Sequence, residues 1–173
     1  KKNNILVFPT GLISTSIFVY LLFKWQLIGD MLINGYYFIM SLYGWYIWTR
    51  KIDSEQVTPI SKTTKKEQLI GGIIFIATLL FVYVVYQFFD MWRDWVAYVD
   101  TFTTALFFVG MWLMAKRKIE NWIFWIVADV ISVPLYFYKG YTFSSLQYFG
   151  FTIIAIFGFL AWKKHLVNSH QTA

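Results

Sequence analysis

Six long apolar runs alternate with short polar segments along this chain. Each run is close to the length of about 20 residues that an α-helix needs to cross the hydrocarbon core of a bilayer. A backbone in lipid must satisfy its own hydrogen bonds, so unbroken runs predict helices, whereas barrel strands would be about ten residues long with alternating polarity. The predicted membrane helices cover 4–23, 26–49, 68–89, 95–115, 119–138 and 142–162. The pattern therefore predicts an all-α integral membrane protein with six transmembrane helices.

The composition supports this class. Of the 173 residues, 58% are hydrophobic and 14% are charged, whereas a soluble domain has about 45–50% apolar and about 25% charged residues. The chain has no cysteine, and its two histidines, His165 and His170, lie in the last nine residues. Disulfides, thiolate metal sites and a haem held between two membrane helices are therefore excluded.

The basic residues fall mainly on one side of the predicted serpentine of helices. Twelve of the 15 Lys and Arg residues lie in segments on the side that holds both ends of the chain. The other side, called here the sparsely charged side, holds Lys24, Arg93 and Lys139. By the positive-inside rule the basic side faces the cytoplasm, so we expect a multi-pass protein with a cytoplasmic C-terminus. The net charge of +6 is thereby explained without a nucleic-acid partner.

Two parts of the chain resemble each other. Segments 42–48 and 156–162 share a glycine at their third position and a tryptophan at their seventh, 114 residues apart. Upstream, with a small shift in spacing, Phe8 corresponds to Trp125. The matched helices start from the same side of the membrane, so the repeat is parallel, as in SWEET-type sugar carriers.

A complete bundle of this kind would have a 3+1+3 arrangement. We expect the first helix to be missing from this chain, because only two helices precede the central one. The predicted organisation is 1–51 as the remainder of the first repeat, 52–67 as a cytoplasmic loop, 68–94 as the central linker helix with a short external loop, 95–164 as the second repeat and 165–173 as a cytoplasmic tail.

Polar side chains recur at membrane depth on four predicted helices. Such groups are costly in lipid and usually face a cavity or the bundle interior. On helix 26–49 they follow steps of three and four from Asp30 to Trp48, which places them on one face. Aromatic surfaces beside amides and carboxylates suit a flat, cationic heterocycle with a hydroxyl-rich attachment. The alternative is that these residues only join the helices to one another. The candidate substrate-binding residues are Asn34, Tyr37, Trp45, Asp100, Asn121, Trp122, Trp125, Asp129, Gln147 and Tyr148.

No motif typical of an enzyme occurs in the chain. There is no phosphate-binding loop, no metal-spaced set of histidines and cysteines, and no close pair of acidic residues at membrane depth. We therefore expect no enzyme activity, no catalytic residue, no metal and no cofactor. Three aspartates at membrane depth, Asp30, Asp100 and Asp129, leave coupling to a proton gradient open.

Two segments resemble the PnuC family of bacterial nicotinamide riboside transporters. They are 120–125, with the sequence ENWIFW, and 42–48, with the sequence LYGWYIW. The similarity covers most of the chain and is weakest over 53–94. It implies a SWEET-like bundle of seven helices in the bacterial inner membrane, assembled as a homo-oligomer, with a trimer implied. It also implies facilitated diffusion, made unidirectional by phosphorylation of the vitamin precursor in the cytoplasm.

The resemblance also implies roles for individual residues. Asn121, Trp122 and Trp125 would bind the nicotinamide end of the substrate. Partners for the ribose or the pyridinium would be Asn34, Asp100, Gln147 and Tyr148.

We therefore predict a uniporter for nicotinamide riboside that works by alternating access. A first alternative is a proton- or sodium-coupled carrier of a related vitamin such as thiamine or riboflavin. A second alternative is a non-catalytic membrane scaffold subunit, whose aromatic residues would serve only as membrane belt and core.

Overall fold

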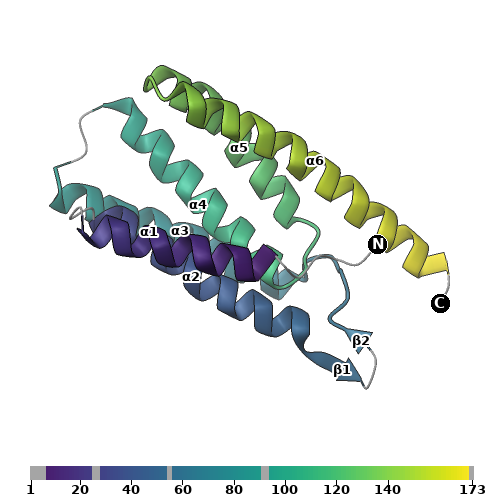
Figure 1. The fold of residues 1–173 in the computed structure, drawn as a ribbon. Helices are drawn as coiled ribbons and strands as arrows, with labels where there is room; N and C mark the ends of the chain where they lie inside the picture. Colours follow the sequence, from purple (N-terminus) through teal and green to yellow (C-terminus); the bar gives the residue numbers. More distant parts are fainter. Residues whose placement is uncertain (1–6, 25–27, 54–55, 91–93, 172–173) are drawn as a thin grey trace. The chain divides into compact units, whose positions relative to one another are not determined.

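The computed structural model describes residues 7–24, 28–53, 56–90 and 94–171 of the chain. In this part the chain forms six helices and one short hairpin (Figure 1). They are α1 (Val7–Lys24), α2 (Ile28–Thr49), β1 (Lys51–Asp53), β2 (Gln56–Val57), α3 (Lys65–Phe88), α4 (Trp95–Ala115), α5 (Asn121–Tyr138) and α6 (Thr142–Gln171). The predicted all-α class and the order of six helices are confirmed.

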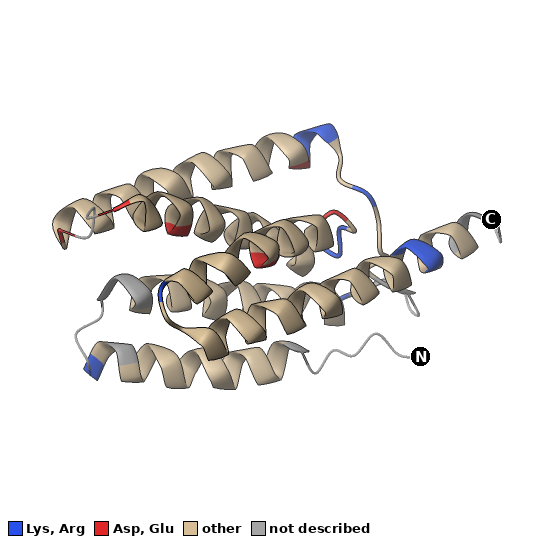
Figure 2. Ribbon diagram, turned by 90° about the horizontal axis from the view of Figure 1, so that it is seen from above, with Lys and Arg blue, Asp and Glu red and all other residues tan. Residues whose placement is uncertain are grey.

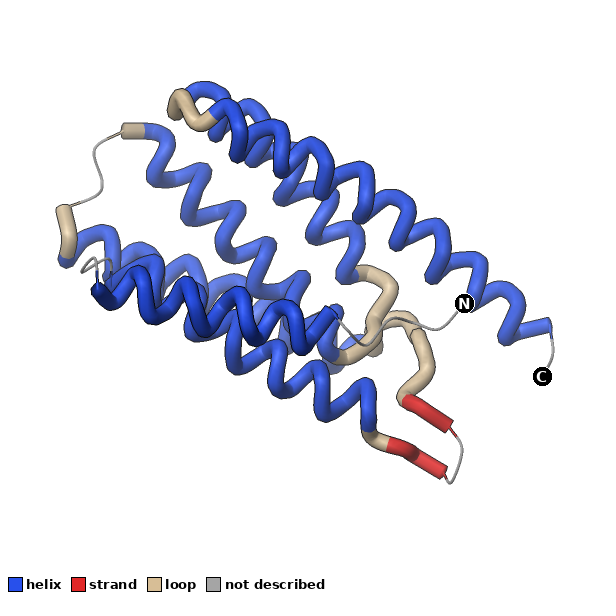
Figure 3. Tube along the Cα trace, in the orientation of Figure 1, coloured by secondary structure: helices blue, strands red, loops and turns tan. Residues whose placement is uncertain are grey.

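The differences from the predicted elements lie at the basic side. The loop predicted at 52–67 contains β2 and most of β1, which form an antiparallel hairpin in which Lys51 pairs with Val57 and Asp53 with Gln56 (Figure 3). Helix α6 continues to Gln171, well past the predicted end at 162, so the helical backbone extends beyond the apolar run.

Four of the described helices are long and apolar enough to cross a membrane. They are α3, α4, α5 and the Thr142–Asn168 part of α6, and α1 contains a shorter apolar stretch, Phe8–Leu21. Helix α2 has 22 residues, which is a sufficient length. Its sequence includes four tyrosines, two tryptophans, one amide and one carboxylate.

The chain divides into two compact units. The first contains Lys1–Pro59 and Ala115–Arg117, and the second contains Ile60–Met114 and Lys118–Ala173. Helix α3, predicted as a central linker, therefore falls in the same unit as α4, α5 and α6. The predicted division into two repeats and a linker stays a prediction.

In the first unit, α1 packs along α2 through one aromatic residue that lies on a glycine. The Phe8 ring covers Gly44 so closely that a Cβ there would overlap it. The same ring meets Trp48 edge to face, with centroids 4.8 Å apart and planes at 82°. Phe8 is 1% exposed and Trp48 is 6% exposed, so the contact forms the buried centre of this helix pair.

The second unit repeats this arrangement between α5 and α6. The Trp122 ring covers Gly158, where a Cβ would lie 2.5 Å from ring atom Cη2. Trp122 also meets Trp162 edge to face, with centroids 5.4 Å apart and planes at 87°. The glycine and the second tryptophan are the positions that the sequence repeat had matched.

One part of the predicted repeat alignment is wrong. Phe8 was matched to Trp125 with a shifted spacing, but by its packing it corresponds to Trp122. The offset is then the same 114 residues for the ring, the glycine and the second tryptophan. The predicted alignment was shifted because the sequences of α1 and α5 differ around Phe8 and Trp122, although the two helix pairs share the same packing geometry.

Helices α3 and α4 complete the second unit. Gly71 of α3 lies against Val109 and Trp112 of α4, and Phe75 meets Phe102 edge to face at 5.7 Å. On its other side α4 meets α5, where Gly110 lies under Phe124 and Trp125. Helix α4 is therefore the inner helix of this unit, which explains why most of its residues are buried.

Charged residues concentrate at helix ends and in connecting segments, and long stretches of each helix are free of them (Figure 2). In the second unit, a buried network joins the start of α3 to the connection between α4 and α5. Lys118 Nζ lies 3.0 Å from Glu67 Oε2, and both side chains are 11% exposed. Lys118 Nζ also donates to Ser61 Oγ at 3.0 Å, and Thr63 N donates to both carboxylate oxygens of Glu120.

Glu67 has a second role in this network. Together with Thr64 it forms a capping box, in which each side chain accepts a hydrogen bond from the other residue's backbone N–H. One carboxylate thus pairs with Lys118 and closes the first turn of α3.

Arg117, the neighbour of Lys118, belongs to the first unit. It is 6% exposed, adopts a left-handed backbone conformation with φ of 56°, and stacks its guanidinium 4.7 Å from the Trp48 ring centroid. Burial lowers the pKa of the Arg117 guanidinium from its ordinary value. Two of the three basic residues at 116–118 are therefore packed structural groups, and the sequence had assigned them only to membrane sidedness.

Substituting either packing glycine is expected to destabilise its helix pair. Gly158→Ala places a methyl group inside the Trp122 ring contact, and Gly44→Ala does the same under Phe8. Overpacking of this kind costs about 1–3 kcal/mol, so we expect a lower melting temperature for the protein in detergent. Gly150→Ala and Gly35→Ala are matched controls, because no atom lies within 4 Å of the added Cβ. Equal melting temperatures for all four variants would contradict the packing interpretation.

Breaking the buried ion pair is expected to cost more than removing an exposed lysine. Lys118→Met removes the ammonium that lies 3.0 Å from the buried Glu67 carboxylate, a loss of about 3–5 kcal/mol for pairs of this kind. The exposed Lys62 gives the control, Lys62→Met, which should melt within a degree or two of the parent protein. Thermal unfolding followed by tryptophan fluorescence would measure both.

Candidate functional site

The candidate site is built on one face of α5. Among the described residues, six buried side-chain N or O atoms have no hydrogen-bond partner, and five of them lie on this helix. They are Asn121 Oδ1, Trp122 Nε1, Trp125 Nε1, Asp129 Oδ1 and Ser132 Oγ. Steps of three and four residues place these atoms along one face, which we call the α5 polar column.

The column is buried as well as unpaired. Asn121 is 0% exposed, Asp129 is 2% exposed and Ser132 is 1% exposed. A buried polar atom in lipid costs free energy unless it is hydrogen-bonded. The column therefore presents donors and acceptors that a polar ligand would satisfy.

Trp122 and Asn121 combine a structural contact with an unpaired atom. The Trp122 ring packs on Gly158 and Trp162, while its indole N–H has no partner. Asn121 donates through Nδ2 to the Lys118 carbonyl, while its amide oxygen has no partner. In both residues one part of the side chain holds the fold and another part is buried without a hydrogen-bond partner.

Trp125 lies at the centre of the second unit. A Cβ on Gly110 would lie 3.4 Å from Trp125 Nε1, so the glycine gives the indole its space against α4. The ring meets Phe107 with centroids 5.4 Å apart. Trp125 is half-buried, so its aromatic surface is partly accessible.

A cluster of aromatic rings continues from Phe107 toward the sparsely charged end of the unit. Phe107 stacks on Tyr148 at 6.0 Å with planes at 25°, and Tyr148 meets Tyr136 at 4.9 Å. At the end of α5, Lys139 Nζ lies 2.9 Å from Asp100 Oδ2 of α4 and 4.9 Å from the Tyr136 ring centroid. The cluster therefore ends in an ion pair.

The charge on Lys139 is maintained by its partners. Burial lowers the pKa of the Lys139 ammonium, but the hydrogen bond and negative charge of Asp100 outweigh it, so the pKa is raised above its ordinary value. A raised pKa means that the stability from this pair is fully present below the ordinary lysine pKa and is lost only as pH rises through the higher, folded-state value. The pair therefore persists throughout the neutral range.

The predicted candidates on α2 belong to the first unit. Asn34 and Tyr37 are half-buried, whereas Trp45 is 40% exposed. Along the predicted stripe of this helix, Ser41 and Trp48 are buried in the contact with α1, whereas Trp45 is exposed. The side chain of Asp30 lies outside the described residues.

In the second unit the structure separates the predicted candidates. Tyr148 joins the aromatic cluster, whereas its neighbour Gln147 is exposed on α6. Asp100 is not free for a ligand in this structure, since it pairs with Lys139. The hydroxyls of Thr103 and Thr152, part of the predicted polar faces, donate to carbonyls of their own helices.

Sequence reasoning did not identify four residues that the structure places in or beside the site. Ser132 and Tyr136 continue the three- and four-residue steps of the α5 polar column, so extending that pattern by two positions would have found them. Phe107 and Lys139 had no such signal, because their relevance comes from contacts between different helices. In the described part of the chain, no group of three or more His, Cys, Asp or Glu residues could hold a metal ion.

Comparisons with known proteins identify the family and the fold of this chain. A family model described as nicotinamide mononucleotide transporter matches residues 1–164. The nicotinamide riboside transporter PnuC of Escherichia coli (strain K12) is 26% identical over 176 residues, covering 88% of this chain and 73% of that protein. The riboflavin/roseoflavin transporter RibM of Streptomyces davaonensis is 29% identical over 130 residues, covering 71% of this chain and 58% of that protein.

The fold has a solved counterpart. The crystal structure of the vitamin B3 transporter PnuC aligns with a TM-score of 0.63 over 94% of this chain and 73% of that chain, at 22% identity. This match confirms the predicted membrane-transporter fold, and the family match confirms the resemblance to PnuC. The family consists of multi-pass membrane transporters, which confirms the expectation that the protein is not an enzyme. The chain belongs to the nicotinamide mononucleotide transporter family.

Proposed function

We propose that this protein carries nicotinamide riboside across the membrane by facilitated diffusion. The observation that carries the proposal is the α5 polar column, whose unpaired amide, indole and carboxylate atoms lie beside aromatic rings. Ribose hydroxyls pair with such atoms, and a pyridinium ring stacks on aromatic faces and is attracted to carboxylates. The similarity to nicotinamide riboside transporters supports the same substrate.

The charges favour the riboside over the mononucleotide. Asp129 is the acidic residue of the column, and its ionised form would attract a pyridinium cation and repel a phosphate. The described lysine nearest to the aromatic cluster, Lys139, is already paired with Asp100. A phosphate in lipid would require cationic partners at membrane depth.

The proposed mechanism is alternating access without an ion gradient. The excess of basic residues on the side that holds both ends of the chain supports a cytoplasmic C-terminus in a bacterial inner membrane, with the sparsely charged side outside. The three-helix repeats would rock around a midplane site. The protein would act as a homo-oligomer, a trimer by family resemblance, and Asn34, Tyr37, Trp45 and Gln147 stay candidate contacts for the substrate.

Uptake into proteoliposomes tests the substrate. We expect saturable uptake of labelled nicotinamide riboside that stops at equal concentrations inside and outside and does not respond to a pH or sodium gradient. Accumulation that follows either gradient would support the coupled carrier instead. Saturable uptake of riboflavin or thiamine without the riboside would overturn the proposed substrate, and riboflavin is the stronger rival because RibM is a relative.

Two tryptophan variants test the site. Trp125→Leu removes an aromatic surface worth about 1–3 kcal/mol in stacking, so we expect KM for the riboside to rise about tenfold or more. Trp122→Phe keeps an aromatic ring at this position, as Phe8 provides in the first unit, and removes the indole N–H together with part of the ring that packs on Gly158. A lost hydrogen bond of about 1 kcal/mol should raise KM about fivefold. An unchanged KM with an unchanged melting temperature would leave Trp122 with a packing role only.

A further inference from the structure

The Lys139 ammonium lies in a site of a kind that binds organic cations. One side is the Asp100 carboxylate, 2.9 Å away, and another is the face of Tyr136, whose ring centroid is 4.9 Å away. The side chains of Lys139 and Asp100 are 25% and 19% exposed, so water reaches this place only in part. A carboxylate beside an aromatic face attracts any cation of suitable size, because charge attraction and the ring quadrupole act together.

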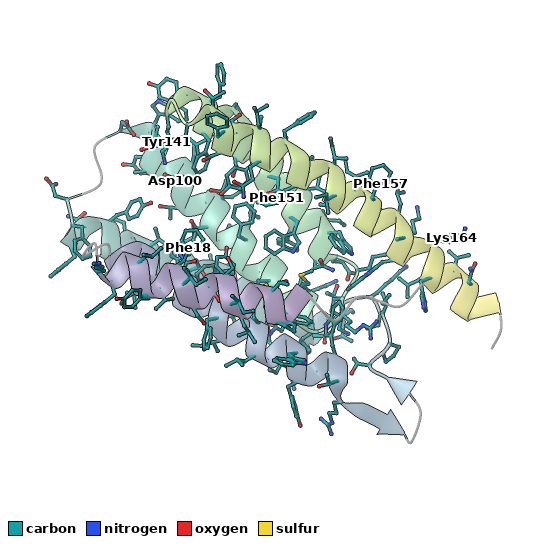
Figure 4. The ribbon with its side chains drawn as sticks, in the orientation of Figure 1. Phe18, Asp100, Tyr141, Phe151, Phe157 and Lys164 are labelled. Carbon is teal, nitrogen blue, oxygen red and sulfur yellow. The ribbon has the colours of Figure 1, made fainter. Side chains whose placement is uncertain are left out.

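The rings behind this ion pair lead into the unit. Tyr136 meets Tyr148, Tyr148 stacks on Phe107, and Phe107 meets Trp125, with centroid separations of 4.9, 6.0 and 5.4 Å. Figure 4 shows Asp100 and Tyr141 at one end of this unit and Phe151, which also touches Tyr148, farther along α6. Aromatic surface is therefore continuous from the ion pair to the α5 polar column.

We propose that Asp100 and Tyr136 form an entry subsite for a flat aromatic cation, which the Lys139 ammonium itself fills in this structure. An arriving pyridinium displaces the ammonium from the carboxylate and the ring. It then moves along Tyr148 and Phe107 to Trp125, exchanging one aromatic face for the next. Each step keeps the positive charge against a π surface, which offsets the cost of moving a cation away from water. This inference rests on the proposed transport of a cationic riboside.

The competing explanation is that the ion pair only ties the end of α5 to α4. The two explanations predict different effects of removing the two partners. If the pair is structural, removing either partner weakens the protein in the same way. If Lys139 competes with the substrate for Asp100, removing the lysine helps the substrate and removing the aspartate harms it.

The test measures KM for labelled nicotinamide riboside in proteoliposomes of the full chain. Lys139→Met should lower KM about threefold to tenfold, and Asp100→Asn should raise it about tenfold, as expected for gain or loss of one partly buried ionic contact. The neutral 1,4-dihydropyridine form of the riboside should show neither change. Lys24→Met, which removes another cation at the end of a helix on the sparsely charged side, is the matched control and should leave KM unchanged.

An increase in KM in both Lys139→Met and Asp100→Asn would overturn the entry subsite. So would equal effects on the cationic and neutral forms. If Asp100→Asn does not fold, Tyr136→Leu replaces it: KM should rise about fivefold, and Tyr136→Phe, which keeps the ring, should recover most of that loss. Parent protein that transports no riboside at all would refute the proposed function instead, so the two failures are distinguishable.

Discussion

A polar atom within the hydrocarbon core has no water to bond with, and the arrangement of this protein follows from that constraint. The hydroxyls of Thr78, Thr101 and Thr103 meet it by donating to carbonyls of their own helices. Asp100 meets it by pairing with Lys139. The α5 polar column does not meet it within the described part of the chain. Where a protein leaves buried donors and acceptors unpaired on one helix face, the natural complement is a polar ligand.

The two helix pairs show how one packing device serves two purposes. In α1 and α2 the ring on the glycine is a phenylalanine, and in α5 and α6 it is a tryptophan. Both rings pack on a glycine and meet a second tryptophan edge to face, but only the tryptophan ring also carries an N–H group. The second pair therefore keeps the scaffold of the first and adds hydrogen-bonding capacity, which explains why the candidate site is concentrated on α5.

The basic connection between α4 and α5 also has a double role. Its charges indicate the cytoplasmic side in the sequence, yet Arg117 and Lys118 are buried in the structure. Arg117 stacks on Trp48, while Lys118 pairs with Glu67. A charge can mark membrane sidedness and still be a structural group, because the positive-inside rule depends only on where the residue lies relative to the bilayer.

The lengths of the hydrophobic runs were enough to predict the helices, because a helix that crosses lipid requires about 20 apolar residues regardless of which helices pack against it. The bounds of α4 agree with the run at 95–115 for that reason. The short hairpin after α2 and the extension of α6 were not predictable from apolar content, because they lie where water can satisfy the backbone. Within α5, periodicity placed Trp125 and Asp129 on one face correctly, since the helix itself sets those angles.

The partners of these side chains required the folded chain. Asp100 is separated from Lys139 by 39 residues and Phe107 from Tyr148 by 41, and no local pattern links either pair. The exposure of Gln147 and the partial burial of Tyr148 likewise depend on which side of α6 meets the other helices. Local periodicity states which residues share a face, whereas packing between helices decides which faces meet and which polar atoms remain unpaired.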